Sequence, residues 1–174
     1  MKIIRFKTNK KVINQSGFSL IELILYLGIL SILIVALFQL LTSIFDIQLE
    51  SQSTSSVSQD GGFILNRFEY DVGRAESVSF PLLGDQGQSL EIFDGQNTYT
   101  YSLIGDNLII SATPSGTSEQ LNSFNTKVTD VTFQTLSDSA QDLRTVTLTF
   151  TLESLVRRRG GTETDTFRTT VGTR

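Results

Sequence analysis

The chain has 174 residues, with 14 basic and 18 acidic side chains and a formal net charge of −4, and it contains neither histidine nor cysteine. The missing imidazole and thiol groups exclude serine or cysteine triads, disulfides and the usual zinc, copper, haem and iron–sulfur sites. The first 17 residues carry five cations and no acid, whereas the remainder carries a net charge of −9. Such an acidic remainder is not expected to bind nucleic acid.

A long apolar run follows the basic block. Glu22 is the only charged side chain in residues 18–45. At about 1.5 Å per helical residue, the run exceeds the roughly 20 residues that cross a bilayer. Five cations before the run and none directly after it predict a single-pass helix, with the amino terminus in the cytoplasm and the head outside.

A cleaved secretory signal peptide is the main alternative for this run. The apolar core of a signal peptide has roughly 7 to 15 residues and is followed by small residues of the A-x-A kind. The run in this chain is longer, and residues 42–50 read Thr-Ser-Ile-Phe-Asp-Ile-Gln-Leu-Glu. A permanent anchor therefore explains the pattern better.

Glu22 is the unusual residue of the run. A carboxylate near one end of a membrane helix costs on the order of a few kcal/mol unless it is paired, protonated or lifted to the interface. Cleavage between Gly17 and Phe18 would create an α-amino group one helical turn away, in the same chain or a neighbouring one. This junction therefore predicts a processing site followed by an assembly contact. Taken without the junction, a carboxylate that snorkels to the interface explains Glu22 equally well.

The order of these residues resembles the class III leader of type IV prepilins and type II secretion pseudopilins. The resemblance rests on the Lys-rich leader, Ser16-Gly17, the segment Phe18-Ser-Leu-Ile-Glu22 and the apolar helix. It implies cleavage after Gly17 by the prepilin peptidase, N-methylation of Phe18, and insertion of the helix into a filament core. There Glu22 would neutralise the amino terminus of an adjacent subunit. Gln39 stands where many major pilins have proline, which favours a minor pilin or pseudopilin.

A helical stem is expected after the apolar run. Residues 46–60 are polar and rich in serine, which by itself fits a linker or a weak helix. An apolar stripe with spacings of three and four then predicts an amphipathic helix, and it comprises Val57, Gly61, Ile64, Phe68, Val72 and Ala75. We expect one helix from about residue 18 to 75, loosened at Gly61-Gly62. The alternative is a break followed by a new helix with Asp60 as its N-cap.

The hydrophobic period changes to two after Ala75. Alternation at 90–92 and 99–103, with turn signals between the two segments and after the second, predicts a three-strand meander that ends at 108–111. A loop rich in Ser, Gly and Thr is expected at about 113–120.

The clearest strand lies near the end of the chain. Residues 145–153 alternate strictly, with Val146, Leu148, Phe150 and Leu152 on one face and Thr and Glu on the other, so one side of the sheet is buried and one is wet. A further strand is expected around 131–134. A hairpin through 157–161 leads to a last strand at about 164–171.

These elements predict an α+β fold. An apolar sheet face must be covered, and the stripe of residues 57–75 is the apolar helical stripe available. The result is a pilin-like architecture, in which a long N-terminal transmembrane α-helix packs on an antiparallel β-sheet head. The expected parts are a cleaved basic leader (1–17), a transmembrane and assembly helix (18–45), a helical stem packing on the head (46–76), and a β-rich globular head (77–174).

Later segments resemble the J-type pseudopilins and the W-type minor pilins. They are the helix end at 68–75, the hairpin at 99–107 with Leu108, and the terminal segment 166–174. This resemblance is looser than that of the leader, because Thr-rich strands are common.

Other polar residues of the chain fit structural roles. The Arg157–Arg159 triplet is expected to be a solvated hairpin tip. Asp85 and Asp94 lie in turns and lack the spaced acids of a calcium loop. Asp71 shows no apolar surroundings in sequence and is not expected to join an acid–base pair. Two explanations fit Tyr26, Gly28, Ser31 and Gln39. These residues either mark a helix face that packs on neighbouring helices or are polar and small residues that any helix tolerates.

The sequence thus predicts a structural assembly protein with no active site, metal or cofactor. It would be a minor pilin or pseudopilin, held in the cytoplasmic membrane and then built into an extracellular pilus or pseudopilus. The implied partners are the prepilin peptidase and N-methyltransferase, membrane lipid, major and minor pilin subunits and, indirectly, the inner-membrane assembly platform and its ATPase. The competing hypothesis is a single-pass anchored adhesin, which needs no Gly17–Phe18 junction and gains nothing from Glu22.

Overall fold

The computed structural model describes residues 17–138 and 143–173. The basic leader, apart from Gly17, lies outside these residues. The chain divides after Ser43 into two compact units, which are described separately below.

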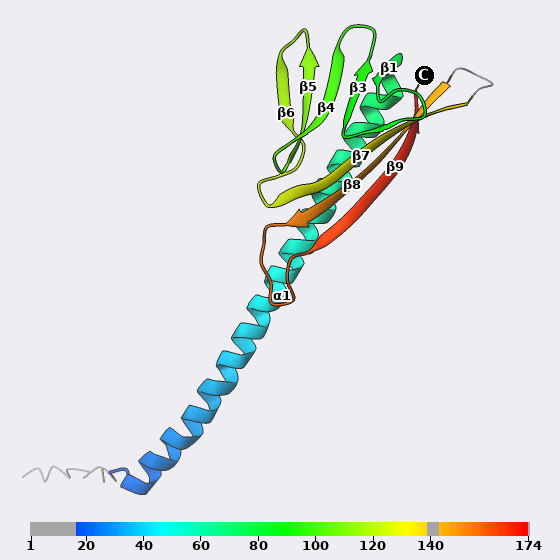
Figure 1. Ribbon diagram of the computed structural model, residues 1–174. Coiled ribbons are helices and arrows are strands. Elements are labelled where there is room, and N and C mark those ends of the chain that lie inside the picture. The colour runs from blue at the N-terminus through cyan, green and yellow to red at the C-terminus, as the bar shows by residue number, and fades with distance from the viewer. Residues whose placement is uncertain (1–16, 139–142, 174) are drawn as a thin grey trace, which may run out of the picture. The chain divides into compact units, whose positions relative to one another are not determined.

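One helix, α1, runs from Leu20 to Arg74 (Figure 1). The expected helix is confirmed, and it continues through Gly61-Gly62. A glycine in a helix interior costs about 1 kcal/mol relative to alanine, so tertiary packing has to hold the helix together at this point. The alternative of a break before residue 61 is wrong.

In the described part of the chain, nine strands form two antiparallel sheets. The first sheet has the order β1-β3-β4-β5-β6, with β1 Ser77–Phe80, β3 Ser89–Phe93, β4 Thr98–Ile104, β5 Asn107–Thr113 and β6 Thr117–Gln120. The second has the order β2-β7-β8-β9, with β2 Gln86–Gly87, β7 Thr126–Asp138, β8 Leu143–Ser154 and β9 Thr164–Gly172. The predicted meander is confirmed as β3-β4-β5.

The expected loop at 113–120 is wrong for its second half, which is strand β6. β6 pairs with β5 from Ile109↔Gln120 to Ala112↔Thr117. All four residues of β6 are exposed. An edge strand without a buried side chain leaves no alternating apolar signal, so its polar composition resembled that of a loop.

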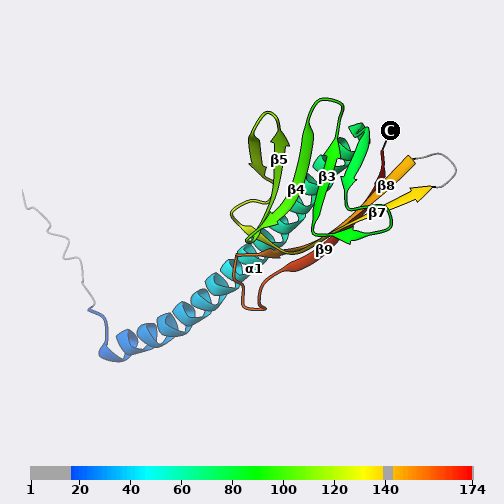
Figure 2. The same ribbon diagram turned by 45° about the horizontal axis from the view of Figure 1, so that its top comes forward.

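The apolar stripe of α1 covers both sheets. Its residues Val57, Ile64, Phe68, Val72 and Ala75 are at most 2% exposed. They share one cluster with side chains of both sheets, which include Leu90, Ile92, Tyr101, Leu108 and Ile110 from the first and Val131, Phe133, Val146, Leu148, Phe150 and Leu152 from the second. Figure 2 shows both sheets against the C-terminal part of the helix. The predicted α+β fold class is therefore confirmed.

Strand β8 has the two faces that its alternation predicts. The alternating residues Val146, Leu148, Phe150 and Leu152 are fully buried. Two threonines on its other face meet threonines of β9, with hydroxyl–hydroxyl distances of 2.9 Å for Thr147–Thr170 and Thr151–Thr166. These cross-strand pairs lie in register and tie β9 to β8.

Gly61 is required where β9 approaches the helix. A Cβ atom at this position would overlap the ring of Phe167. That ring stacks on Phe150, with ring centroids 5.3 Å apart. The glycine that weakens the helix locally is thus the one that lets the last strand close onto it.

A polar cluster lies inside the core. Asp71 is 2% exposed, and its Oδ2 accepts hydrogen bonds from Arg67 Nε at 2.8 Å and from the Tyr101 hydroxyl at 2.6 Å. The hydrogen bond to Asp71 raises the pKa of Arg67. Burial and the neighbouring Asp71 raise the pKa of Tyr101, which keeps the phenol a donor. The ring of Tyr101 packs on Phe68 and Phe133.

The Gly61–Phe167 contact can be tested by paired substitutions. Gly61→Ala and Gly62→Ala bring the same gain in helix propensity, but a Cβ at Gly62 meets no atom within 4 Å. The difference in the free energy of unfolding between the two variants therefore measures the effect of the overlap with Phe167. We expect Gly61→Ala to be less stable than Gly62→Ala by about 1–3 kcal/mol. Urea denaturation of the full chain in detergent, followed by circular dichroism, measures it. Equal stability of the two variants would contradict the contact.

The polar cluster makes a second prediction. Tyr101→Phe removes a hydroxyl that donates to a buried carboxylate, so we expect the free energy of unfolding to fall by about 1.5–3 kcal/mol in the same assay. Tyr99→Phe is the matched control, because the Tyr99 hydroxyl lies 3.5 Å from Arg74 Nη2 at the surface, and its loss should change stability by no more than about 0.5 kcal/mol. If Tyr101→Phe lost no more stability than Tyr99→Phe, the Tyr101 hydroxyl would not be needed, and Arg67 alone would satisfy Asp71.

Candidate functional site

The first unit presents apolar side chains without covering them. The most apolar window of α1 has a mean hydropathy of 2.7 and is 0% buried, so this helix is long and apolar enough to cross a membrane. Phe18 is 76% exposed, and residues between Leu20 and Leu41 expose large aliphatic side chains on every side. Exposed apolar surface of this extent requires lipid or other apolar helices around it.

The predicted processing junction lies outside the helix. Gly17, Phe18 and Ser19 are exposed and precede Leu20, the first helical residue. A Cβ atom at Gly17 would meet nothing within 4 Å. The peptide bond between Gly17 and Phe18 therefore lies in an exposed segment outside any helix or strand, where a peptidase can reach it.

Glu22 lies in the first turn of α1, where the helix dipole favours a negative charge. Its Oε1 accepts a hydrogen bond from the Tyr26 hydroxyl at 3.1 Å. The Tyr26 ring meets the Phe18 ring edge to face, with centroids 6.2 Å apart. The structure thus brings Phe18 and Glu22 together through Tyr26. The i, i+4 spacing from Glu22 to Tyr26 is the sequence signal that could have indicated this pair.

The other polar groups suggested for the helix surface are satisfied locally. The Ser31 hydroxyl donates to the carbonyl of Gly28 at 2.8 Å, and Thr42 donates to the carbonyl of Gln39 at 2.9 Å. Such bonds within one helix leave the hydroxyl no obligatory partner elsewhere. They do not distinguish a packing face from ordinary helix surface.

Asp60 has a role in the second unit that the sequence did not indicate. Its Oδ2 accepts hydrogen bonds from the backbone N–H of Ser123 at 2.8 Å, from the Ser123 hydroxyl at 2.7 Å and from the Thr126 hydroxyl. The carboxylate therefore fastens the loop before β7 to the helix. Phe124, within this loop, is 85% exposed.

The Arg157–Arg159 hairpin is not solvated throughout, so that expectation is wrong for Arg158, whose side chain is 22% exposed. Arg158 pairs with Glu50 of α1 at 3.0 Å and with Glu163 across the hairpin. Arg159, although its side chain is 83% exposed, lies 3.1 Å from Asp46. Arg158 and Arg159 each lie beside an acid, which offsets part of the positive charge of the hairpin.

Asp94 is a turn residue, as expected. Its Oδ1 accepts hydrogen bonds from the backbone N–H groups of Asn97 at 2.7 Å and Gln96 at 3.0 Å, and these bonds lower the pKa of Asp94. Arg74 lies 3.2 Å from its other oxygen. Among the described residues, no three acidic side chains converge in a way that could hold a metal ion.

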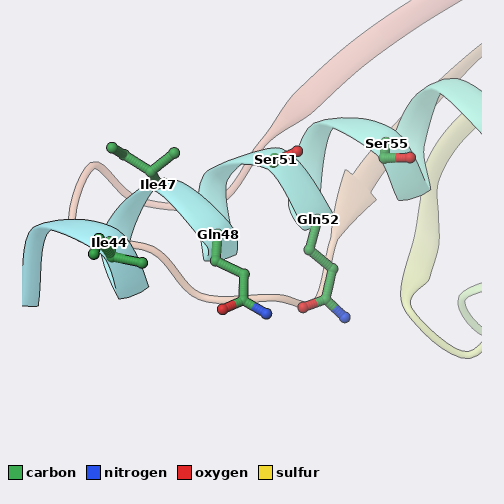
Figure 3. A pocket seen from close by; sticks show the side chains of 6 residues that line it. All are labelled: Ile44, Ile47, Gln48, Ser51, Gln52 and Ser55. Carbon is green, nitrogen blue, oxygen red and sulfur yellow. The ribbon is translucent and has the colours of Figure 1, made fainter. Parts of the chain in front are cut away.

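The hollow in Figure 3, of about 620 Å³, lies along one face of α1. It has no charged side chain in its lining, which is formed by Ile44, Ile47, Gln48, Ser51, Gln52 and Ser55. A hollow of about 60 Å³ beside Arg67 and Glu119 is close to the size of one or two water molecules, which is too small for an organic substrate.

Comparison with known proteins identifies the amino-terminal segment. Residues 13–38 match the family model of the prokaryotic N-terminal methylation motif. No curated protein and no solved structure matches the chain. The matched segment contains Gly17, Phe18, Glu22 and Tyr26.

This motif is the class III leader of type IV pilins and pseudopilins, and it points to a structural protein that is processed rather than to a catalyst. The helix that follows can cross a membrane, and the second unit has the α+β packing expected of a pilin head. The leader motif and the fold are thus similar to those of type IV pilins and pseudopilins.

Proposed function

We propose that the chain is a minor pilin or pseudopilin, a structural subunit of a type IV pilus or of a type II secretion-like pseudopilus. The observation that carries this proposal is the N-terminal methylation motif at residues 13–38. Gly17 and Phe18 are its cleavage and methylation site, and Glu22 is its assembly residue. Gln39 in place of a helix-kinking proline supports a minor subunit.

The parts of the chain follow from this role. Residues 1–17 are the leader that the prepilin peptidase removes, and residues 18–45 are the transmembrane and assembly helix. Residues 46–76 are the stem that packs on the head of residues 77–174. The exposed apolar surface of the helix supports lipid as its first environment and other pilin helices as its second.

The proposed topology places the amino terminus in the cytoplasm and the head outside. It is supported by the five cations before the apolar run, because cytoplasmic flanks of membrane helices are rich in Lys and Arg. The subunit would pass from the cytoplasmic membrane into an extracellular filament. The inner-membrane platform and its ATPase would supply the motive force, because the chain shows no nucleotide-binding loop in its sequence.

Processing can be measured directly. We expect mass spectrometry of the chain from its host membrane to find Phe18 as an N-methylated first residue. Gly17→Val should block cleavage, because a branched side chain would replace open space beside the scissile peptide bond. Gly28→Ala, a substitution inside the helix, should be cleaved normally. A mature protein that retains Met1 would sink the processing proposal.

The role of Glu22 can be separated from membrane insertion. We expect Glu22→Ala and Glu22→Gln chains to remain in the membrane fraction but to be depleted in sheared filaments, because the charge that pairs with a neighbouring amino terminus is lost. Immunoblots give the ratio of the chain in sheared filaments to the chain in the membrane fraction. Glu69→Gln, the same change on α1 beyond the apolar run, should not alter this ratio. Normal incorporation of Glu22→Ala would remove the proposed role of Glu22.

A further inference from the structure

Glu22 is the most enclosed residue of segment 17–43, the part of its unit that the structure describes. Every other residue from 17 to 43 is exposed, whereas Glu22 is partly covered. In a segment of such uniform exposure, a charged side chain that is more covered than its apolar neighbours needs a local cause. That cause is the residue one helical turn further on, Tyr26.

Tyr26 makes two contacts that point in the same direction. Its hydroxyl donates to Glu22 Oε1 at 3.1 Å, and its ring packs against the edge of Phe18 at an interplanar angle of 76°. Glu22 and Tyr26 are four apart and therefore share one face of the helix, while Phe18 lies just before its first residue. The tyrosine thus contacts both the carboxylate and the residue that becomes the new chain end.

The hydrogen bond from Tyr26 to Glu22 stabilises the carboxylate in a bilayer. A carboxylate in a membrane helix needs a donor or a cation nearby, and water is scarce there. Tyr26 supplies a donor from the same chain before any neighbour arrives. Among the described residues no donor lies on Glu22 Oε2, so one oxygen is held and the other stays open.

We propose that Tyr26 is a positioning residue for assembly: it fixes the Glu22 side chain beside Phe18 and leaves Oε2 open for the amino group of a neighbouring processed chain. This inference rests on the proposed assembly role of Glu22. Tyr26 itself need not touch the neighbour. The competing role of Tyr26 is that of an aromatic residue which merely anchors the helix in the interfacial layer of the membrane.

Tyr26→Phe tests the proposal, because it removes the hydroxyl and keeps the ring on Phe18. The fraction of chain in sheared filaments is compared for wild type, Tyr26→Phe, Glu22→Ala and the double variant. We expect Tyr26→Phe to lower incorporation about tenfold, as the loss of one hydrogen bond to a charged group predicts. In the Glu22→Ala background the same change should have no further effect.

The controls separate positioning from anchoring. Tyr70→Phe, which removes a hydroxyl of α1 outside the apolar run, should not change incorporation, and all chains should be found in the membrane fraction. Wild-type incorporation of Tyr26→Phe, or an equal loss with and without Glu22, overturns the proposal and leaves Tyr26 as an interfacial anchor.

A readout independent of filaments distinguishes this inference from the proposed function. Infrared difference spectra between the wild-type and Glu22→Gln chains in lipid vesicles isolate the carboxyl bands of Glu22. We expect Tyr26→Phe to shift those bands, because their hydrogen bond is lost, and Tyr70→Phe to leave them in place. Normal assembly of Glu22→Ala would refute the assembly role of Glu22, whereas unshifted bands in Tyr26→Phe would refute the positioning role of Tyr26.

Discussion

Burial of one helical stripe against two sheets is the interaction on which the head depends. An antiparallel sheet with a single apolar face is not stable unless something covers that face. In the described chain, two such sheets turn their apolar faces to α1, and the stripe from Val57 to Ala75 serves both. The stripe also accounts for Gly61, since a larger residue there would keep Phe167 and β9 away from the helix.

The same helix carries three partly or fully covered carboxylates that accept hydrogen bonds from hydroxyl groups. Glu22 accepts from Tyr26, Asp71 from Tyr101, and Asp60 from Ser123 and Thr126. In each case a hydroxyl provides a donor, and Asp71 alone also has an arginine within hydrogen-bonding distance. The chain has no histidine, and neutral hydroxyl donors compensate for the loss of water around these carboxylates. A hydroxyl remains a donor over the whole physiological pH range.

The sequence allowed prediction of features that depend on local period or register. The helix through Gly61-Gly62, the meander β3-β4-β5 and the strictly alternating β8 all follow from spacing within short segments. The Gly17, Phe18 and Glu22 assignments rest on a motif of consecutive residues. These signals are strong because neighbours in sequence determine them.

Features that depend on distant partners could not be predicted in this way. The expectation that Asp71 lacks apolar surroundings is wrong, because Tyr101, which encloses it, lies on a strand 30 residues later. Arg158 looked free because Glu50 precedes it by 108 residues. The pairing of the short strand β2 with β7, which places β2 in the second sheet, involves two residues and no pattern of its own. Only the three-dimensional structure brings such groups together.

The contact between Gly61 and Phe167 also has a consequence for the order of folding. Phe167 lies on the last strand, so the helix residue that it meets is synthesised long before its partner. Contacts between the two ends of a domain form late and slow the search for the native state. Until β9 docks, Phe167 does not cover Gly61, and the helical stripe lacks its cover at this point.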